Sequence, residues 1–406
     1  MILMQLNSEI FNNIALQYVV GNAEYAEGLS AIKPLRIFDN RVLEFLGDLS
    51  KVLMKSSRVY SDVITLGYWC RRASILKESK KYEEELRLGK GVAFHIAPSN
   101  VPVNFAFSLV SGLLAGNANV VRIPSKDFPQ VTIICDSIRE LLNGEFKDLA
   151  PYILLVRYGH EKAITDAFSS LSSVRIIWGG DSTINTIRES ALPPRANEIT
   201  FADRHSIAVV DADEYLTIKD KDRVAQEFYN DTYFSDQNAC TSPVVIIWIG
   251  KEKDKAKAEF WKYIHNVVKE RYELASVQTV SKLTELYLSA TDIEVKRVKD
   301  NITDVDELIY RIKVQDLDGV VEHKYNSGFF FEYDADKLSE ILPLCTENCQ
   351  TITYCGVAKE TIESFIVESR PRGVDRVVPM GKSMDFALIW DGHDLIREMS
   401  RNVTIL

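Results

Sequence analysis

From residue 90 onward, short apolar runs alternate with longer segments in which apolar residues recur every three or four positions. The short runs predict strands and the longer segments predict amphipathic helices. The predicted strands are 92–97, 119–124, 152–158 and 174–178, and the helices between them include 103–114, 128–143 and 161–170. This alternation is typical of a doubly wound parallel sheet.

A second series of elements follows residue 205. Its predicted strands are 206–211, 244–249, 328–333 and 350–354, and its predicted helices are 223–233 and 254–272. The segment 290–325 is charged and weakly periodic. Before residue 90, one helix is predicted at 42–53 and another at 61–78, and residues 1–37 are expected to form an edge element. The chain is therefore expected to have an α/β fold with two units.

One cysteine has surroundings unlike those of the other five. Cys240 lies in the polar stretch 235–243, directly before the apolar run 244–249. A structural cysteine usually lies inside an apolar periodic segment. A thiol on a polar loop can be exposed, partly ionised and nucleophilic. The alternative is a surface thiol without a role, because no histidine is adjacent in sequence.

Polar residues also follow two neighbouring predicted strands. Asn100 follows the first strand, in the turn 98–102, and Ser125 and Lys126 follow the second. In open α/β sheets, ligands bind beyond the carboxyl ends of the strands. These three residues are therefore candidates for a ligand site.

A further turn follows the strand 174–178. It contains Gly179 and Gly180, and a helix start with Ser182 comes directly after them. Free N–H groups at such a helix start can bind a pyrophosphate. Without other evidence, Gly-Gly before a helix is usually only a turn.

The order of these motifs resembles that of the aldehyde dehydrogenase superfamily. The segment 98–102 is similar to its Pro-x-Asn-x-Pro motif, 115–125 is similar to its following Gly-Asn segment, and Cys240 comes at a similar interval. Three stretches resemble more narrowly the acyl-CoA reductase family of the bioluminescence fatty-acid reductase. They are 236–243, 373–381 and 390–392. The likeness covers most of the chain from about residue 60 onward.

This resemblance implies an aldehyde-dehydrogenase-like fold. We expect a doubly wound nicotinamide-nucleotide-binding domain at 1–205, joined by part of the C-terminal tail. A second α/β domain at 206–355 would carry the catalytic Cys240, and 356–406 would be a C-terminal return segment. A homo-oligomer is also expected.

The chain departs from the hydrolytic members of the superfamily at their general base. Those enzymes supply a glutamate in a Glu-Leu-Gly-Gly-Lys segment, whereas the corresponding stretch here, 200–205, is Thr-Phe-Ala-Asp-Arg-His. Asp203 and His205 do not match the base position. Without that base, a thioester on Cys240 would be hydrolysed poorly. It could instead pass to a thiol such as coenzyme A or be reduced by hydride, which favours a reductase of activated acyl groups. Together with the narrower resemblance, this implies NADPH-dependent reduction of a fatty acyl thioester to the aldehyde.

The resemblance also implies the roles of individual residues. Cys240 would form the acyl-enzyme, and the Asn100 amide with the Cys240 N–H would stabilise the oxyanion. Glu347 resembles the glutamate that holds the nicotinamide ribose, although a solvated loop glutamate is an equal alternative. Lys126, with Arg122 close in sequence, replaces the ribose-binding glutamate of NAD-preferring relatives.

These cations favour NADPH over NADH, because they suit a 2′-phosphate. The remaining cofactor candidates are Ser125, Gly179, Gly180 and Ser182, of which the last three belong to a turn similar to the superfamily's Phe-Thr-Gly-Ser turn.

Composition narrows the class of protein. The net charge of −10 argues against a general nucleic-acid binder. The resemblance implies acyl-CoA or an acyl-carrying protein as the partner. Six cysteines in 406 residues do not suggest a disulfide framework, and the spacing of Cys345, Cys349 and Cys355 favours core thiols over a metal site. No signal peptide and no integral membrane segment is predicted, because no stretch reaches the roughly 18 to 20 apolar residues of a span. A cytoplasmic protein is therefore expected.

Two other functions are compatible with these residues. An acyl-phosphate reductase of the semialdehyde type also lacks the hydrolytic glutamate, although the motif around Cys240 argues against it. A non-redox thiol acyltransferase with the same fold is the other, and nicotinamide binding would distinguish it.

Overall fold

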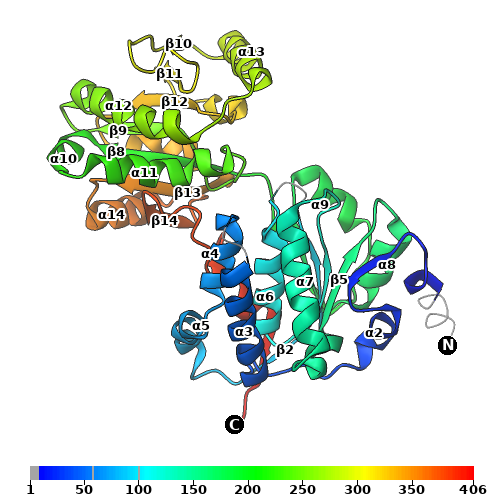
Figure 1. The fold of residues 1–406 in the computed structure, drawn as a ribbon. Helices are drawn as coiled ribbons and strands as arrows, with labels where there is room; N and C mark the ends of the chain where they lie inside the picture. The colour runs from blue at the N-terminus through cyan, green and yellow to red at the C-terminus, as the bar shows by residue number, and fades with distance from the viewer. Residues whose placement is uncertain (1–8, 57–58, 99–100) are drawn as a thin grey trace. The chain divides into compact units, whose positions relative to one another are not determined.

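The computed structural model describes residues 9–56, 59–98 and 101–406. The chain forms two compact units, one of Met1–Ala202 with Phe386–Leu406 and one of Asp203–Asp385 (Figure 1). Residues 356–385 therefore belong to the second unit, whereas the last 21 residues return to the first.

The first unit is built on a six-stranded sheet with the order β1-β5-β4-β3-β6-β7. The strands are β1 (Gln17–Val20), β3 (Val92–Ile96), β4 (Ala118–Arg122), β5 (Ile153–Arg157), β6 (Val174–Trp178) and β7 (Asn197–Phe201). All pairs are parallel except that of β1, which forms an antiparallel edge on β5. The chain builds outward from β3 to β5 and then returns to the other side of β3. The doubly wound parallel sheet is thus confirmed, and the point where strand order reverses lies between β3 and β6.

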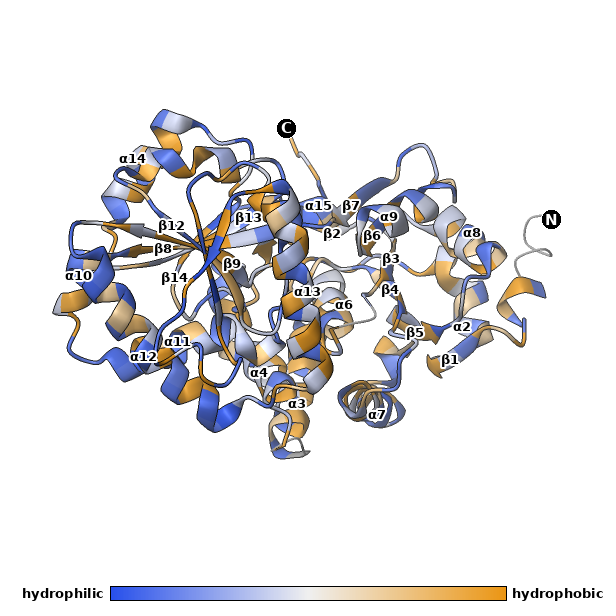
Figure 2. Cartoon of the chain, turned by 90° about the horizontal axis from the view of Figure 1, so that it is seen from above, coloured by the Kyte–Doolittle hydropathy of each residue, from blue (hydrophilic) through white to orange (hydrophobic). Residues whose placement is uncertain are grey.

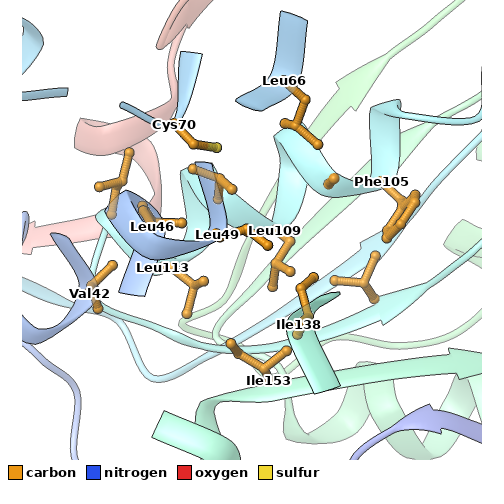
Figure 3. Packing of buried hydrophobic residues seen from close by; sticks show 14 of the residues in the cluster. Val42, Leu46, Leu49, Leu66, Cys70, Phe105, Leu109, Leu113, Ile138 and Ile153 are labelled. Atoms are coloured by element: carbon orange, nitrogen blue, oxygen red, sulfur yellow. The ribbon is translucent and has the colours of Figure 1, made fainter. Parts of the chain in front are cut away.

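Helices cover both faces of this sheet (Figure 1). Apolar side chains of α3, α4, α6 and α7 form the core on one face, and those of α2, α8 and α9 pack on the other. The bounds are α2 (Ala23–Gly28), α3 (Asn40–Ser56), α4 (Ser61–Trp69), α6 (Asn104–Leu114), α7 (Pro129–Asn143), α8 (Lys162–Leu171) and α9 (Asp181–Arg188). In the first core, Val42, Leu46 and Leu49 of α3 lie with Leu109 and Leu113 of α6 (Figure 3).

The helix predicted at 61–78 is two helices, α4 and α5 (Arg72–Ser79). The chain turns at Arg71, whose backbone has φ −59° and ψ 133°. Cys70 at the end of α4 is completely buried, while the Arg71 guanidinium lies 3.4 Å from the centre of the Tyr68 ring. The non-helical backbone at Arg71 therefore separates the two helices.

The second unit has a seven-stranded sheet with the order β10-β11-β12-β9-β8-β13-β14. The strands are β8 (His205–Asp211), β9 (Pro243–Ile249), β10 (Val295–Arg297), β11 (Tyr310–Val314), β12 (Phe329–Asp334), β13 (Cys349–Cys355) and β14 (Arg376–Pro379). Side chains of α10 (Ala212–Thr217), α11 (Lys221–Asp231) and α12 (Lys253–Arg271) pack on one face, and those of α14 (Lys359–Ser369) pack on the other.

The α-helices and strands of this unit that were not predicted are α10, α13 (Ser276–Asp292), α14, β10, β11 and β14. Helix α13 buries Lys282 and Ser289, while Val277 and Val280 on it are 70% and 64% exposed. Figure 2 shows that helices of both units carry polar and apolar residues side by side. Hydropathy alone therefore does not reveal that α13 turns its polar side toward the protein. Strand β11 was not recognised in the sequence because it contains charged residues. One of them, Arg311, is nevertheless buried, because it forms ion pairs with Asp300 and Glu332.

The C-terminal segment completes the first unit. Strand β17 (Ser400–Asn402) pairs with β2 (Arg87–Gly89), and β15 (Ile389–Trp390) with β16 (His393–Asp394) forms a hairpin. Asp391 and Gly392 between them have φ of 51° and 77°. Such a left-handed pair is typical of a two-residue hairpin turn, which gives the segment 390–392 a structural role.

Candidate functional site

Cys240 is exposed, whereas the other five cysteines are buried. It lies on the Cys240 loop, residues 235–243, which follows α11 and a short 3₁₀ turn and leads into β9. The Ser206 hydroxyl donates a 2.7 Å hydrogen bond to the Cys240 carbonyl oxygen and so holds the loop to β8. Burial raises the pKa of Cys70, Cys135 and Cys355 to about 12, which makes those thiols poor nucleophiles.

The shape of this loop depends on two left-handed residues. Asp236 and Gln237 have φ of 51° and 53°, a conformation that costs energy for residues other than glycine. The Gln237 side chain is buried, and its Oε1 accepts hydrogen bonds from the main-chain N–H groups of Gly328 (2.7 Å) and Phe329 (3.2 Å). Its amide nitrogen donates to the carbonyl oxygens of Pro243 and Phe329. The glutamine of the motif therefore joins the loop to β12.

The Asp236 carboxylate is held from two other segments. The Tyr272 hydroxyl donates to one oxygen, and Gln278 of α13 (3.0 Å) and Ser327 (3.3 Å) donate to the other. Asn238 accepts a 3.0 Å hydrogen bond from Asn326. These bonds leave the motif's polar side chains engaged with the protein and leave the Cys240 side chain exposed.

The loop also contacts the segment 381–384. Asp231, the last residue of α11, accepts hydrogen bonds from Gly381 N–H (2.6 Å), Ser383 N–H (3.0 Å) and the Ser383 hydroxyl (2.8 Å). Burial raises the pKa of the Asp231 carboxyl to about 6. Met384 accepts a 3.1 Å contact from the Thr241 hydroxyl, next to Cys240. Gly381, which ends the motif 373–381, thus bonds to the end of α11 just before the loop, and Thr241 of the loop contacts the same segment.

Glu347 lies at the same end of this sheet as Cys240. It precedes β13, and Cys240 precedes β9, and both strands pair with β8. The Glu347 side chain is 66% exposed and forms an ion pair with Arg372. His205 is buried, with its Nε2 2.9 Å from the Leu344 carbonyl oxygen, and burial lowers its pKa. Asp203 is exposed.

In the first unit, the predicted cofactor residues lie at the carboxyl ends of two strands that flank β3. Arg122 ends β4, Ser125 and Lys126 come just after it, and Gly179 and Gly180 follow β6, with β3 between. Asn100, expected after β3, lies outside the described residues. The structure therefore brings these turns to one edge of the sheet, at the reversal of strand order.

The individual side chains differ in availability. Ser125, Lys126 and Ser182 are exposed, and the Lys126 ammonium lies 5.1 Å from the centre of the Phe128 ring. Arg122 is half-buried, donates to the Gly159 carbonyl oxygen (2.5 Å) and stacks on Tyr158.

The turn at Gly179 and Gly180 leads directly into α9. A Cβ at Gly179 would meet the Thr183 side chain at 3.2 Å, so the turn has little room for a larger residue. No described side chain caps the N-terminus of α9, which leaves its first N–H groups available to an anion. Asp181 lies in the same helical turn and would oppose a pyrophosphate.

A buried polar network lies beneath these turns and was not predicted. His95 on β3 lies 2.7 Å from the Ser108 hydroxyl and 3.0 Å from the Asn119 side-chain oxygen. The Trp178 indole donates a 3.0 Å hydrogen bond to Ser108 and stacks on Phe201 with ring centres 3.6 Å apart. Burial lowers the pKa of His95 to about 4, which keeps the imidazole neutral. A histidine and an asparagine within apolar strands were the signal for this network in the sequence.

Neither a metal centre nor a membrane span is found in the part of the chain that the structure describes. Its residues contain no group of three or more histidine, cysteine or acidic side chains arranged to bind an ion. None of its helices combines the length and the apolar character needed to cross a bilayer.

Solved structures show which fold this is. The chain superposes on lactaldehyde dehydrogenase with a TM-score of 0.62, over 99% of this chain and 90% of that one, at 12% identity. A Thermus 1-pyrroline-5-carboxylate dehydrogenase with bound NAD gives the same score over 94% of this chain and 83% of its own. A 3,6-anhydro-L-galactose dehydrogenase in complex with NAP gives 0.59, over 99% and 89%, also at 12% identity. The fold is that of the aldehyde dehydrogenases, as expected.

Comparison of sequences points to a narrower group of proteins than comparison of folds does. A long-chain acyl-protein thioester reductase of Photorhabdus laumondii is 24% identical over 78% of this chain, which spans only 63% of that relative's length. The enzyme of the same name from Photorhabdus luminescens is 24% identical over 98% of this chain and 82% of its own length. Residues 71–402 match the family model described as acyl-CoA reductase (LuxC). The chain therefore belongs to the acyl-CoA reductase (LuxC) family.

Proposed function

We propose that this protein reduces a fatty acyl thioester to the aldehyde through an acyl-enzyme on Cys240, with NADPH as the reductant. The observation that carries the proposal is the exposure of Cys240 on a loop that is fixed on three sides by Ser206, Gln237 and Asp236. The other cysteines are buried. Similarity to acyl-protein thioester reductases supports the class of substrate.

The proposed first step is an exchange of thioesters. The Cys240 thiolate attacks the acyl carbon, its new C–S bond forms, the donor's C–S bond breaks, and the donor thiolate leaves. The Cys240 N–H and the Asn100 amide are the proposed donors to the oxyanion. Because one thiolate replaces another, the step needs no strong base.

The absence of the hydrolytic glutamate is consistent with this cycle. In the corresponding stretch, 200–205, the His205 ring is buried with its Nε2 next to a main-chain carbonyl oxygen. The carboxylate of this stretch is Asp203, which is exposed. A bound reduced nicotinamide would supply hydride to the acyl carbon. Loss of the Cys240 thiolate from the resulting thiohemiacetal would then release the aldehyde.

The first unit has features that suit a nicotinamide dinucleotide. The candidate turns lie where the strand order reverses, and the start of α9 offers uncapped N–H groups for a pyrophosphate. Lys126 is exposed and could pair with a 2′-phosphate, which supports NADPH. Glu347 is proposed to bind the nicotinamide ribose, in exchange for its exposed ion pair with Arg372.

An apolar acyl chain also has a suitable surface in the first unit. Trp69, Phe107, Phe386 and Trp390 form an aromatic cluster with successive ring centres 4.7 to 5.3 Å apart. The first three are only partly buried.

The acyl donor is proposed to be acyl-CoA or an acyl-carrying protein. A cytoplasmic location is also proposed, because the cytoplasm would keep the Cys240 thiol reduced.

The test is oxidation of NADPH in the presence of acyl-CoA substrates of increasing length, with mass spectrometry of the protein without NADPH. We expect a long-chain preference and an acyl adduct on Cys240. An adduct without nicotinamide oxidation would indicate a thiol acyltransferase. Activity only with an acyl phosphate would indicate the semialdehyde-type reaction.

A further inference from the structure

Helix α13 has its polar side turned toward the protein. Lys282 is completely buried, although transferring an ammonium group from water to the interior is costly. On the opposite side, Val277, Val280 and Tyr287 are exposed. A helix placed for apolar burial would have the reverse orientation, so the inward polar residues require a separate explanation.

Lys282 holds two strained segments of the backbone. Its ammonium nitrogen donates to the carbonyl oxygens of Glu307 (2.5 Å) and Ser327 (2.8 Å). Both residues are left-handed, with φ of 60° and 62°. Such conformations persist only where neighbouring groups fix them. The Lys282 nitrogen also lies 4.9 Å from the centre of the Tyr310 ring, which adds a cation–π contact.

Ser327 connects this lysine to the Cys240 loop. Its hydroxyl donates to Asp236, and the following Gly328 donates its N–H to Gln237. Gly328 has φ of 83°, and a Cβ there would meet the Leu308 carbonyl oxygen at 2.3 Å. The turn at 327–328 is thus packed closely against Leu308, and the two left-handed residues of the loop, Asp236 and Gln237, are bonded to it.

One helical turn before Lys282, Gln278 makes a parallel connection. Its amide nitrogen donates to Asp236 (3.0 Å) and to the Ser327 hydroxyl (2.9 Å). Two residues of α13 therefore hold the same turn, one at its carbonyl oxygen and one at its hydroxyl.

We propose that Lys282 is a positioning residue for Cys240, which it orients by holding the turn at 327–328 against Asp236 and Gln237. Burial lowers the pKa of Lys282 to about 7. A neutral amine still has two N–H donors, so both carbonyl bonds persist in either protonation state.

The inference rests on the proposed function for its acylation readout, and a second readout is independent of it. Lys282→Met removes the donors and keeps an unbranched side chain. Lys262→Met, the same change at an exposed position of α12, is the control. For each variant, single-turnover acylation by an acyl-CoA and alkylation of Cys240 by iodoacetamide are followed, and thermal unfolding is recorded.

We expect Lys282→Met to lower both rate constants at least tenfold, with Lys262→Met unchanged and NADPH affinity within twofold of the wild type. A purely structural role would lower the melting temperature and the fraction of active protein but not the rate constants. That result would overturn the proposal. If the wild type is alkylated at Cys240 but not acylated, the proposed function fails, while the alkylation rates still test Lys282.

If Lys282→Met does not fold, Gln278→Met serves as the second variant, because this half-buried residue contacts the same turn. A tenfold loss in the same two rate constants is expected. Unchanged rate constants in folded Gln278→Met would overturn the proposed connection from α13 to Cys240.

Discussion

The Ser206 hydroxyl donates a 2.7 Å hydrogen bond to the main-chain carbonyl oxygen of Cys240. Ser206 is completely buried on β8, the strand that lies between β9 and β13. The bond fixes the Cys240 peptide to a central strand of its sheet. It is thus placed to hold the main chain while the thiol stays exposed.

Ser206→Ala should lower the rate constant of Cys240 acylation about fivefold. The reason is that losing one hydrogen bond, worth about 1 kcal/mol, frees the Cys240 peptide to rotate. Single-turnover acylation measures this change, and Ser276→Ala at an exposed position is the control. A variant as fast as the wild type would assign the bond to folding only.

Cys240→Ala should abolish reduction and leave nicotinamide binding unchanged, because the thiol carries the covalent step. Steady-state NADPH oxidation and direct NADPH titration check the two parts. After acyl-CoA treatment of the wild type, the adduct should be on Cys240 and on none of Cys345, Cys349 and Cys355. Turnover retained in the variant would contradict the mechanism.

Gln237→Leu should lower the free energy of unfolding by about 2 to 4 kcal/mol. The substitution leaves the Gly328 and Phe329 N–H groups without the acceptor that they share in a buried place. Urea denaturation measures the loss. A change below about 1 kcal/mol would mean that water replaces the glutamine.

Lys126→Glu should weaken NADPH binding by about 1.5 to 3 kcal/mol and leave NADH binding nearly unchanged, because a repulsive charge replaces an attractive one. The ratio of the two dissociation constants in the wild type and the variant is the measurement. A ratio that stays constant, or a wild type that prefers NADH, would remove Lys126 from the cofactor site.

Stability should fall as the pH drops from about 6.5 to 4 because of His95. Its ordinary pKa is 6.5, and burial lowers it to about 4 in the folded protein. Between these values the unfolded chain binds the proton and the folded protein does not, so acid favours unfolding, by on the order of 3 kcal/mol in total. Urea titrations of the wild type and His95→Gln across this range check the slope. An equal slope in both proteins would exclude His95 as its source.

Local sequence was sufficient for much of the fold. The apolar runs that became β3 to β6, β8 and β9 are buried on both faces, and such strands have a pattern that needs no knowledge of their neighbours. The exposure of Cys240 was predictable for the same reason, since the polar residues around it form a loop between a helix and a buried strand. Proline and glycine marked the turns after β3 and β6.

The alternation of elements, the exposed thiol and the family motifs each depend on residues close together in the chain, so they could be predicted from the sequence. The folded structure was needed to show that Gln237 joins β12, that Lys282 and Gln278 of α13 face the turn at 327–328, and that His95 meets Trp178 through Ser108. Gln237, Lys282 and Ser108 are buried against the ordinary preference of their types. The hydrogen bonds named here join residues 13 to 92 positions apart, and no local pattern encodes a partner at that distance.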